Sequence, residues 1–342
     1  MLGLAALPKR SGSRRRLALS AAAKVNLVLE ILGKRADGYH ELATVMQAVD
    51  LSDRLILDEA PDLGLVVNSD VIPGDATNLA LRAAVALREA ARVNGGVHIT
   101  LDKRIPVAAG LGGGSTDAAA VLFGLNRLWR LRWPGARLAE LATKLGMDVP
   151  FFLRGGAALG TARGEVLKPV PAGAVALVLV SPPIESSTAA VYGRVTPSMY
   201  TDGARARTMA GILRTRQAAR VAASLYNGLE AAVAPLHPEI ARMKAALLAA
   251  GALGVAMSGS GPTVFGVARS FEHARQIRAR LTRASWRCWA VRTLGGPAVR
   301  VRTIESMGRT MGRGHAARRG TLDPLFGGSN PPTPTTIRRG RR

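Results

Sequence analysis

The feature that most constrains the fold is a predicted strand, a glycine-rich loop and a predicted helix that follow one another directly. Residues 97–101 alternate as a strand, and apolar residues recur at helical spacing over residues 114–131. The loop before the helix contains four glycines within five residues, at positions 110 and 112–114. Glycine lets the backbone approach a bulky anion, and the first turn of a helix offers unpaired N–H groups and a positive dipole end. This order predicts a phosphate-binding site at the start of the helix.

The helix opens on hydroxyl side chains, Ser115 and Thr116, and Ser115 could reach a magnesium ion. The simpler alternative is a flexible glycine turn with a Ser/Thr cap. A Walker loop is excluded because no lysine follows the last glycine. A dinucleotide-binding fingerprint does not fit either, because its strand, loop and acidic-residue spacing is missing. The segment is therefore a candidate phosphate site of another type.

The remaining pattern favours a mixed α and β protein, with a β-rich opening. At 342 residues the chain is long enough for two domains, and we place the boundary near residue 160. Helices are expected at 78–94, 114–131, 138–145, 221–233, 237–250 and 271–283. Strands are expected at 16–32, 42–49, 54–58, 63–67, 97–101, 175–180, 253–257, 263–267 and 287–293. The second half therefore predicts an α/β layer of its own.

The formal net charge of +24 raises the question of nucleic acid, so its distribution matters. Residues 1–20 contribute +5 and residues 303–342 contribute +6, which leaves +13 for residues 21–302 with their 21 acidic side chains. No basic stripe with interleaved aromatic residues is present, so a nucleic-acid partner is not favoured. A polyanionic small ligand explains part of the surplus equally well.

The single cysteine and the lack of a recognisable export signal or membrane span predict a cytoplasmic protein. The single cysteine, Cys288, cannot form an intramolecular bridge. The longest apolar stretches, residues 174–180 and 245–253, are shorter than the roughly 18 residues that a membrane span needs. In the first residues a short apolar run precedes the basic residues, whereas a secretory signal has its basic residues first and a long apolar run second. We expect no membrane association.

Two glycine loops together resemble the GHMP kinases, the superfamily named after galactokinase, homoserine kinase, mevalonate kinase and phosphomevalonate kinase. Residues 106–119 (PVAAGLGGGSTDAA) resemble the second motif of that family, and residues 257–265 (MSGSGPTVF) resemble its third. The resemblance implies a two-domain α+β GHMP-kinase fold, with an N-terminal ATP-binding domain and a C-terminal ferredoxin-like α/β layer. It implies ATP and Mg²⁺ as cofactors. The implied ATP-binding residues are Pro106, Gly110, Leu111, Gly112, Gly113, Gly114, Ser115, Thr116, Asn78 and Lys103.

Three further segments are similar to the branch of this family that acts on 4-diphosphocytidyl-2-C-methyl-D-erythritol. They are residues 23–27 (AKVNL), 35–41 (RADGYHE) and 145–151 (LGMDVPF). The resemblance runs from about residue 19 to residue 294. It implies phosphorylation of the C2 hydroxyl of that substrate, in the non-mevalonate route to isoprenoids. Another GHMP kinase, acting on mevalonate or homoserine, is the alternative within the family, and the motif at 36–41 argues against it.

By the same resemblance, Asp148 is the general base and Lys24 lies beside it. A cation beside a carboxylate favours its charged form, which agrees with that pairing. The plain alternatives are an exposed strand lysine for Lys24 and a helix-capping aspartate before Pro150 for Asp148. A nucleic-acid-binding protein on the same fold would need neither residue, so their joint presence argues for an enzyme.

The resemblance also implies a substrate pocket that holds the cytidine and the diphosphate. Asn26, Tyr39 and His40 match its positions, and Tyr192, with Thr188 before it, matches an aromatic residue that sandwiches the base. Tyr39 can stack on a pyrimidine, while His40 and Asn26 can hydrogen-bond its edge. Asn78 and Lys103 match positions near the adenine, although Lys103 as a solvated loop lysine is the alternative.

The domain limits expected from the sequence are four segments. Residues 1–18 form a disordered basic extension, 19–160 the ATP-binding domain, 161–302 the C-terminal domain and 303–342 a disordered basic tail. The tail has eight arginines, four prolines, seven glycines and no hydrophobic periodicity, so it lacks the apolar surface that ordering requires. Its terminal arginines could alternatively bind RNA or anionic lipid. The protein is expected to be a monomer or a homodimer.

Overall fold

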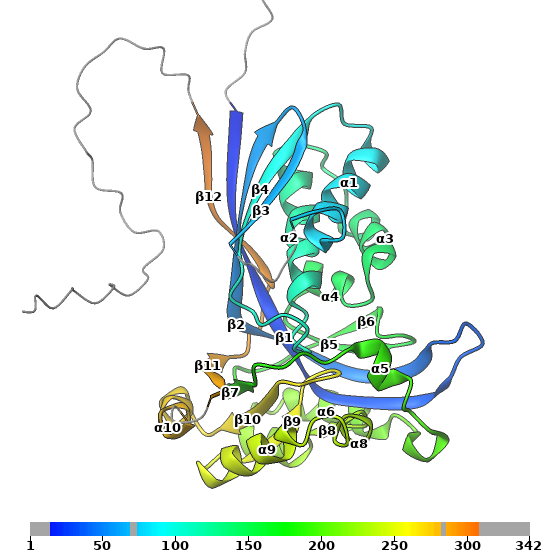
Figure 1. The fold of residues 1–342 in the computed structure, drawn as a ribbon, viewed down its shortest axis with the longest axis vertical. Coiled ribbons are helices and arrows are strands. Elements are labelled where there is room, and N and C mark those ends of the chain that lie inside the picture. The colour runs from blue at the N-terminus through cyan, green and yellow to red at the C-terminus, as the bar shows by residue number, and fades with distance from the viewer. Residues whose placement is uncertain (1–13, 69–73, 282–284, 308–342) are drawn as a thin grey trace, which may run out of the picture. The chain divides into compact units, whose positions relative to one another are not determined.

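Two strands of 21 residues each, β1 (Arg14–Lys34) and β2 (His40–Ala60), run through the large sheet of this protein and form an antiparallel hairpin (Figure 1). The computed structural model describes residues 14–68, 74–281 and 285–307. These residues belong to one compact unit that ends at Met307. Both long strands are rich in apolar residues, mainly Ala, Leu and Val, and most of their described side chains are buried.

The hairpin is the centre of an eight-stranded sheet in the described part of the chain. Its main order is β12 (Val299–Met307), β1, β2, β4 (Gly96–Asp102) and β3 (Leu63–Val67). Three short strands join away from this path: β5 (Ala157–Thr161) pairs with β2, β6 (Val166–Val170) pairs with β5, and β8 (Tyr226–Asn227) pairs with β1. Residues from both halves of the chain therefore build one sheet.

Four helices cover one face of the upper part of this sheet (Figure 1). They are α1 (Leu79–Ala91), α2 (Gly113–Leu128), α3 (Gly135–Leu145) and α4 (Val149–Arg154). The central helix α2 lies close against the strands. A Cβ atom added at Gly124 would lie 2.4 Å from Leu57 Cδ1 and 2.7 Å from Leu19 Cδ1, so a larger residue there would require these leucine side chains to shift. This packing fixes the start of α2 relative to β1 and β2.

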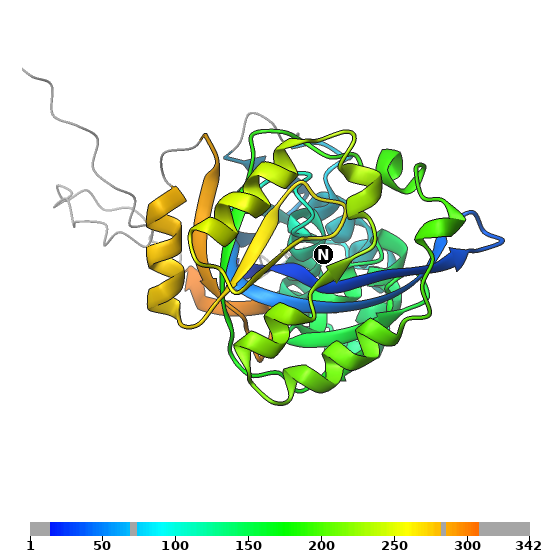
Figure 2. The ribbon, with the colours of Figure 1, turned by 90° about the horizontal axis from the view of Figure 1, so that it is seen from below.

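A second sheet has the order β11 (Arg287–Arg292), β7 (Ala176–Ser181), β10 (Val264–Ala268) and β9 (Gly254–Met257), all antiparallel. With α9 (Glu239–Ala249) and α10 (Phe271–Leu281) in the β-α-β-β-α-β sequence, this is the ferredoxin-like arrangement that the sequence predicted. Figure 2 shows α10 beside β11. All six residues of β7 are buried, because other elements pack on both faces of that strand.

Shorter elements connect the two sheets. They are α5 (Thr188–Tyr192), a 3₁₀ turn (Pro197–Met199), α6 (Ala204–Leu213), α7 (Ala218–Ala223) and α8 (Glu230–Val233). The single helix expected at 221–233 is wrong: α7 and α8 are separate, with β8 between them. The strands expected at 42–49 and 54–58 are likewise one continuous strand, β2.

The structure also moves the limits of the folded unit. The boundary expected near residue 160 falls inside β5. At the two ends, β1 begins at Arg14 and β12 continues to Met307, and the pairs from Arg14 with Met307 to Ala18 with Thr303 extend the sheet. The expected limits at residues 18 and 302 are therefore wrong by a few residues, because strand pairing between distant segments orders both. The remaining parts of the expected extension and tail, 1–13 and 308–342, lie outside the described residues.

Candidate active site

A cleft of about 1150 Å³ brings most of the predicted site residues together. Its walls come from β1 and β2, the glycine loop, the start of α4 and helix α5. The predicted residues that line it are Lys24, Asn26, Tyr39, His40, Asn78, Lys103, Pro106, Gly110, Gly112, Gly113, Gly114, Ser115, Asp148, Thr188 and Tyr192. Leu111 and Thr116 are fully buried and lie behind this wall.

Lys24 and Asp148 face each other in the cleft. The Lys24 Nζ lies 3.4 Å from Asp148 Oδ2, and the side chains are 5% and 35% exposed. Asp148 occupies the N-cap position of α4, yet its side chain makes no capping hydrogen bond. The capping alternative for Asp148 and the exposed-lysine alternative for Lys24 are therefore both wrong.

A chain of buried hydrogen bonds orients Lys24 from behind. Its Nζ donates to Asn26 Oδ1 at 2.6 Å, Asn26 Nδ2 donates to Thr44 Oγ1 at 2.8 Å, and Thr44 Oγ1 donates to the Val28 carbonyl at 2.7 Å. The ammonium is thus held on one side by a neutral amide and on the other by the Asp148 carboxylate. Asn26 serves Lys24 in this arrangement, a contact that the sequence alone did not predict.

The glycine loop packs closely on the backbone at Ser258 and on the side chains of Phe152 and Lys24. Gly110 and Gly112 have φ angles of +75° and +71°, which L-residues rarely adopt. A Cβ added at Gly110 would lie 2.0 Å from the Ser258 carbonyl oxygen, and one at Gly112 would lie 3.3 Å from Lys24 Cγ. The loop therefore delivers the start of α2 directly beside Lys24.

The second glycine loop, residues 257–265, packs on the first. Ser258 Oγ donates to the Gly110 carbonyl at 2.9 Å and accepts the Asn26 N–H at 3.3 Å. Asn227 Nδ2 donates to the carbonyls of Met257 and Gly259, both at 2.8 Å. A Cβ at Gly259 would lie 3.3 Å from Lys24 Nζ. Both glycine loops and the Lys24 strand thus meet at one point.

Aromatic rings gather at the other end of the cleft. The rings of His40 and Tyr192 have centroids 5.4 Å apart. Burial, together with the charge of Lys34, lowers the pKa of His40 below its ordinary value, so the neutral ring is favoured. Burial and the nearby Asp148 raise the pKa of Tyr192. Thr188 Oγ1 lies 2.8 Å from Ser260 Oγ, which ties the start of α5 to the second glycine loop.

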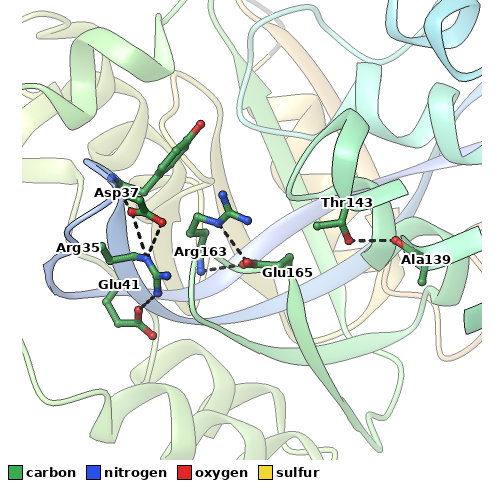
Figure 3. A network of polar contacts seen from close by, with 8 residues as sticks. Arg35, Asp37, Glu41, Ala139, Thr143, Arg163 and Glu165 are labelled. Carbon is green, nitrogen blue, oxygen red and sulfur yellow. Dashed lines mark hydrogen bonds and ion pairs between the residues drawn. The ribbon is translucent and has the colours of Figure 1, made fainter. Parts of the chain in front are cut away.

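Tyr39 sits at the tip of the β1–β2 hairpin and is 54% exposed. In that tip Arg35 contacts both Asp37 and Glu41, and Asp37 Oδ1 accepts the Tyr39 N–H at 3.2 Å (Figure 3). The guanidinium of Arg163, from the β5–β6 turn, lies 5.1 Å from the centre of the Tyr39 ring. A ring exposed on one side is free to stack on a planar group.

Lys103 is buried, so the solvated-lysine alternative is wrong. Its Nζ lies 2.5 Å from Asp53 Oδ2 and 2.7 Å from Asp117 Oδ2. Burial opposes its charge, but the two carboxylates raise the pKa of Lys103 above its ordinary value. Asn78 also lines the cleft, and its Oδ1 accepts the Ala80 N–H at 2.9 Å as the N-cap of α1.

The donor set of the cleft suits Mg²⁺ held together with phosphates. In the described part of the chain, no three His, Cys, Asp or Glu side chains form a cluster that could hold a metal ion. Mg²⁺ typically keeps several waters and is bound by a few protein oxygens plus substrate phosphates, so no such cluster is required. The Ser115 hydroxyl in the first turn of α2 is an oxygen donor of the required kind.

Comparisons with known proteins agree with this geometry. The family model for the GHMP kinases N terminal domain matches residues 78–156, and that for GHMP kinases C terminal matches residues 209–288. The 4-diphosphocytidyl-2-C-methyl-D-erythritol kinase of Pelotomaculum thermopropionicum is 47% identical over 276 residues, which cover 80% of this chain and 96% of that protein. The chain belongs to the 4-diphosphocytidyl-2-C-methyl-D-erythritol kinase family of GHMP kinases.

Another relative and a solved structure support the same family assignment. The relative from Gloeobacter violaceus is 47% identical and covers 76% of this chain and 88% of its own length. A crystal structure of 4-(cytidine 5'-diphospho)-2C-methyl-D-erythritol kinase has a TM-score of 0.72, with 39% identity, over 82% of this chain and all of that one. A homoserine kinase from Cytophaga hutchinsonii, at 21% identity and a TM-score of 0.66, shows the shared fold alone. The predicted α+β GHMP-kinase fold is confirmed.

The sequence did not reveal every side chain on the cleft wall. Asp117, Lys34, Thr44 and Arg163 all line the cleft, and none was predicted. Asp117 follows the two hydroxyl residues of the second motif, which is the one signal that could have found it. Arg163 has no comparable signal, because only the pairing of β5 with β2 brings it to the hairpin tip.

Among the residues that the structure describes, no helix combines the length and apolar character needed to cross a membrane.

Proposed function

We propose that this kinase transfers the γ-phosphate of ATP to the C2 hydroxyl of 4-diphosphocytidyl-2-C-methyl-D-erythritol, in the non-mevalonate route to isoprenoids. The observation that carries the proposal is the Lys24–Asp148 pair, 3.4 Å apart, located where the glycine loop meets the aromatic end of one cleft. Phosphoryl transfer needs an activated hydroxyl in line with a held phosphate, and a carboxylate and an ammonium beside the glycine loop support a site of this kind.

Asp148 is the proposed general base. Its carboxylate is 35% exposed and unused by the helix that it begins, so it is available to accept the proton of the substrate hydroxyl. Lys24 keeps this carboxylate ionised and stabilises negative charge that develops on the hydroxyl oxygen. Asn26 and Thr44 hold Lys24 in place through their hydrogen bonds.

The glycine loop and the first turn of α2 are the proposed ATP site. The backbone N–H groups of residues 112–115 belong to the N-cap and the first turn of α2, where such groups lack intrahelical partners and stabilise phosphate oxygens. Leu111 helps to position this loop through its backbone, because its carbonyl oxygen accepts a hydrogen bond from the backbone N–H of Lys24 at 3.0 Å. Pro106, Asn78 and Lys103 line the same cleft, and the resemblance assigns Asn78 and Lys103 to the neighbourhood of the adenine. Mg²⁺, held by Ser115 and the phosphates, would supply charge neutralisation.

The aromatic end is the proposed cytidine and diphosphate pocket. Tyr39 and Tyr192 offer ring faces for the base, and neutral His40 can both donate to and accept from its edge. Thr188 and Asn26 complete the wall between this pocket and the Lys24–Asp148 pair. A site built to hydrogen-bond a particular base rejects compounds that lack it, which gives specificity for the cytidylylated substrate.

A coupled ADP-release assay with three acceptors tests this function. We expect turnover with 4-diphosphocytidyl-2-C-methyl-D-erythritol and little with mevalonate or homoserine. Comparable turnover with mevalonate or homoserine would support the alternative GHMP-kinase activity, and no turnover with any acceptor would contradict the proposal. Retention on DNA or RNA that falls steeply with salt would favour the nucleic-acid alternative. The cytoplasmic location and the monomeric or homodimeric state stay predictions of the sequence.

A further inference from the structure

Lys103 joins three elements at a single buried nitrogen. The residue follows β4, its partner Asp53 belongs to β2, and its other partner Asp117 belongs to α2. The ammonium lies 2.5 Å and 2.7 Å from the two carboxylates, and its side chain is only 7% exposed. A buried charge is tolerated where it is paired and hydrogen-bonded, and here both conditions are met. The cluster is therefore a fixed cross-link rather than a mobile surface contact.

Asp53 extends this cross-link to the backbone. Its Oδ1 accepts the N–H groups of Arg104 at 2.6 Å and Ile105 at 2.9 Å, while Oδ2 binds Lys103. The carboxylate is fully buried. Three charge-assisted hydrogen bonds to one carboxylate set the direction in which the chain leaves β4 and enters the glycine loop.

The ammonium lies directly beneath the first residue of α2. A Cβ atom added at Gly113 would lie 3.1 Å from Lys103 Nζ and 3.2 Å from Ile105 Cγ2. Gly113 is the first residue of α2, and the first turn of this helix contains the proposed phosphate-binding N–H groups. A displacement of the cluster would therefore be transmitted to the phosphate site without any intervening flexible side chain.

The two carboxyl groups of the cluster differ in how their oxygens are used. Burial and the neighbouring Asp53 raise the pKa of Asp117 well above its ordinary value, against the opposing effect of Lys103. Asp117 Oδ1 is buried and has no hydrogen-bond partner among the described residues, whereas Asp53 uses both oxygens. Asp53 is therefore held by three hydrogen bonds and Asp117 by one, so Asp53 is the more important of the two anchors of Lys103.

We propose that Lys103 is a positioning residue, whose ammonium, clamped by Asp53 and Asp117, fixes the first turn of α2 and hence the phosphates of ATP, rather than selecting the adenine base. This inference rests on the proposed kinase function and deepens it, because it assigns the charge of Lys103 to the phosphate end. Asp53 and Asp117 gain a defined role in the same step.

The test compares Lys103→Met with the intact enzyme, using ATP and GTP as phosphate donors. Because displacement of about 1 Å in a reacting group can cost about 10²-fold in rate, we expect a loss of about that size in kcat/KM for ATP. The same factor should apply to GTP, so the ATP-to-GTP ratio stays within about threefold. Affinity for ADP, measured by titration, should fall, while affinity for the cytidylylated substrate is retained. A tenfold change in the ATP-to-GTP ratio, or unchanged ADP affinity, would overturn the proposal.

Two isosteric variants decide the matter even where Lys103→Met does not fold. Asp117 uses one oxygen, so the amide of Asp117→Asn can keep the bond to Lys103. Asp53 uses both oxygens, so Asp53→Asn must turn its NH₂ group toward either the ammonium or the backbone N–H groups. We expect the loss in kcat/KM for ATP to be at least tenfold greater for Asp53→Asn than for Asp117→Asn. Equal losses, or the reverse order, would overturn the proposal. Glu272→Gln, which breaks the exposed ion pair with Arg275 on α10, is the matched control. Absence of turnover in the wild type would count against the proposed function instead, since ADP titration needs no acceptor.

Discussion

Replacement of Asp148 by asparagine isolates the proposed proton transfer from binding. The amide keeps the size of the side chain but cannot accept a proton. Positioned proton transfer typically contributes about 10²–10⁴-fold to rate, which corresponds to about 3–5 kcal/mol in the activation barrier. We therefore expect Asp148→Asn to lower kcat by about 10²-fold or more.

The structure indicates that folding should survive this change. Asp148 is 35% exposed, and its contact with Lys24 is a single ion pair at 3.4 Å. Partly exposed pairs of this kind contribute about 1 kcal/mol or less to stability. The residue makes no capping hydrogen bond that asparagine would lose, and Lys24 keeps its bond to Asn26. A shift in Tm of less than about 4 °C is expected.

The assay is ADP release at saturating ATP and acceptor, together with titration of ADP against the variant. Affinity for ADP should stay within about threefold of wild type, since the glycine loop is untouched. The matched control is Asp62→Asn, a carboxylate that contacts His98 at 3.2 Å on the surface. The reasoning fails if Asp148→Asn turns over near the wild-type rate, or if its loss of activity simply follows a loss of folded protein.

Three further predictions address the pocket and the chain ends. Tyr39→Ala and His40→Ala should raise the KM for the cytidylylated substrate far more than the KM for ATP, and parallel increases would contradict the pocket assignment. Burial and the charge of Lys34 lower the pKa of His40, so its ring stays neutral to a lower pH than usual. The KM for the cytidylylated substrate should therefore stay constant above about pH 6.5. It should rise only at lower pH, where His40 becomes protonated. A KM that instead rises with alkalinity would refute this. A chain ending at Met307 should keep the full kcat/KM. A chain ending at Arg302 should have a lower Tm, because it loses the pairing of residues 303–307 with β1. An equal Tm for the two chains would show that this pairing does not contribute to stability.

The chemistry of the site was the most predictable part of this protein. The glycine motif needs glycine at particular positions, because Gly110 and Gly112 adopt positive φ angles and a Cβ at either would collide with neighbouring atoms. The facing of Lys24 and Asp148 followed from the resemblance and is present in the structure. Residue type and local order decide the glycine positions, whereas the pairing of Lys24 with Asp148, which are far apart in sequence, was reached only through the resemblance.

Features that depend on distant partners were missed. The first half of β2 is buried on both faces and its second half alternates, so the pattern changed within one strand and resembled two. Asp53 lies in that second half, 50 positions from Lys103 and farther still from Asp117. Nothing near it in sequence signals a buried charge. Helix α5, with five residues, has too little periodicity to be recognised.

Three separate motifs depend on one another through Ser258. Its hydroxyl donates to the glycine loop at Gly110 and accepts the N–H of Asn26, which in turn binds Lys24. Because Ser258 is fully buried, neither bond can be replaced by water without a change in packing. The position of Lys24, the partner of the proposed general base, is thus coupled to the position of the proposed phosphate loop. This coupling explains why each motif could be recognised alone in the sequence, while the geometry that makes them one site belongs to the folded chain.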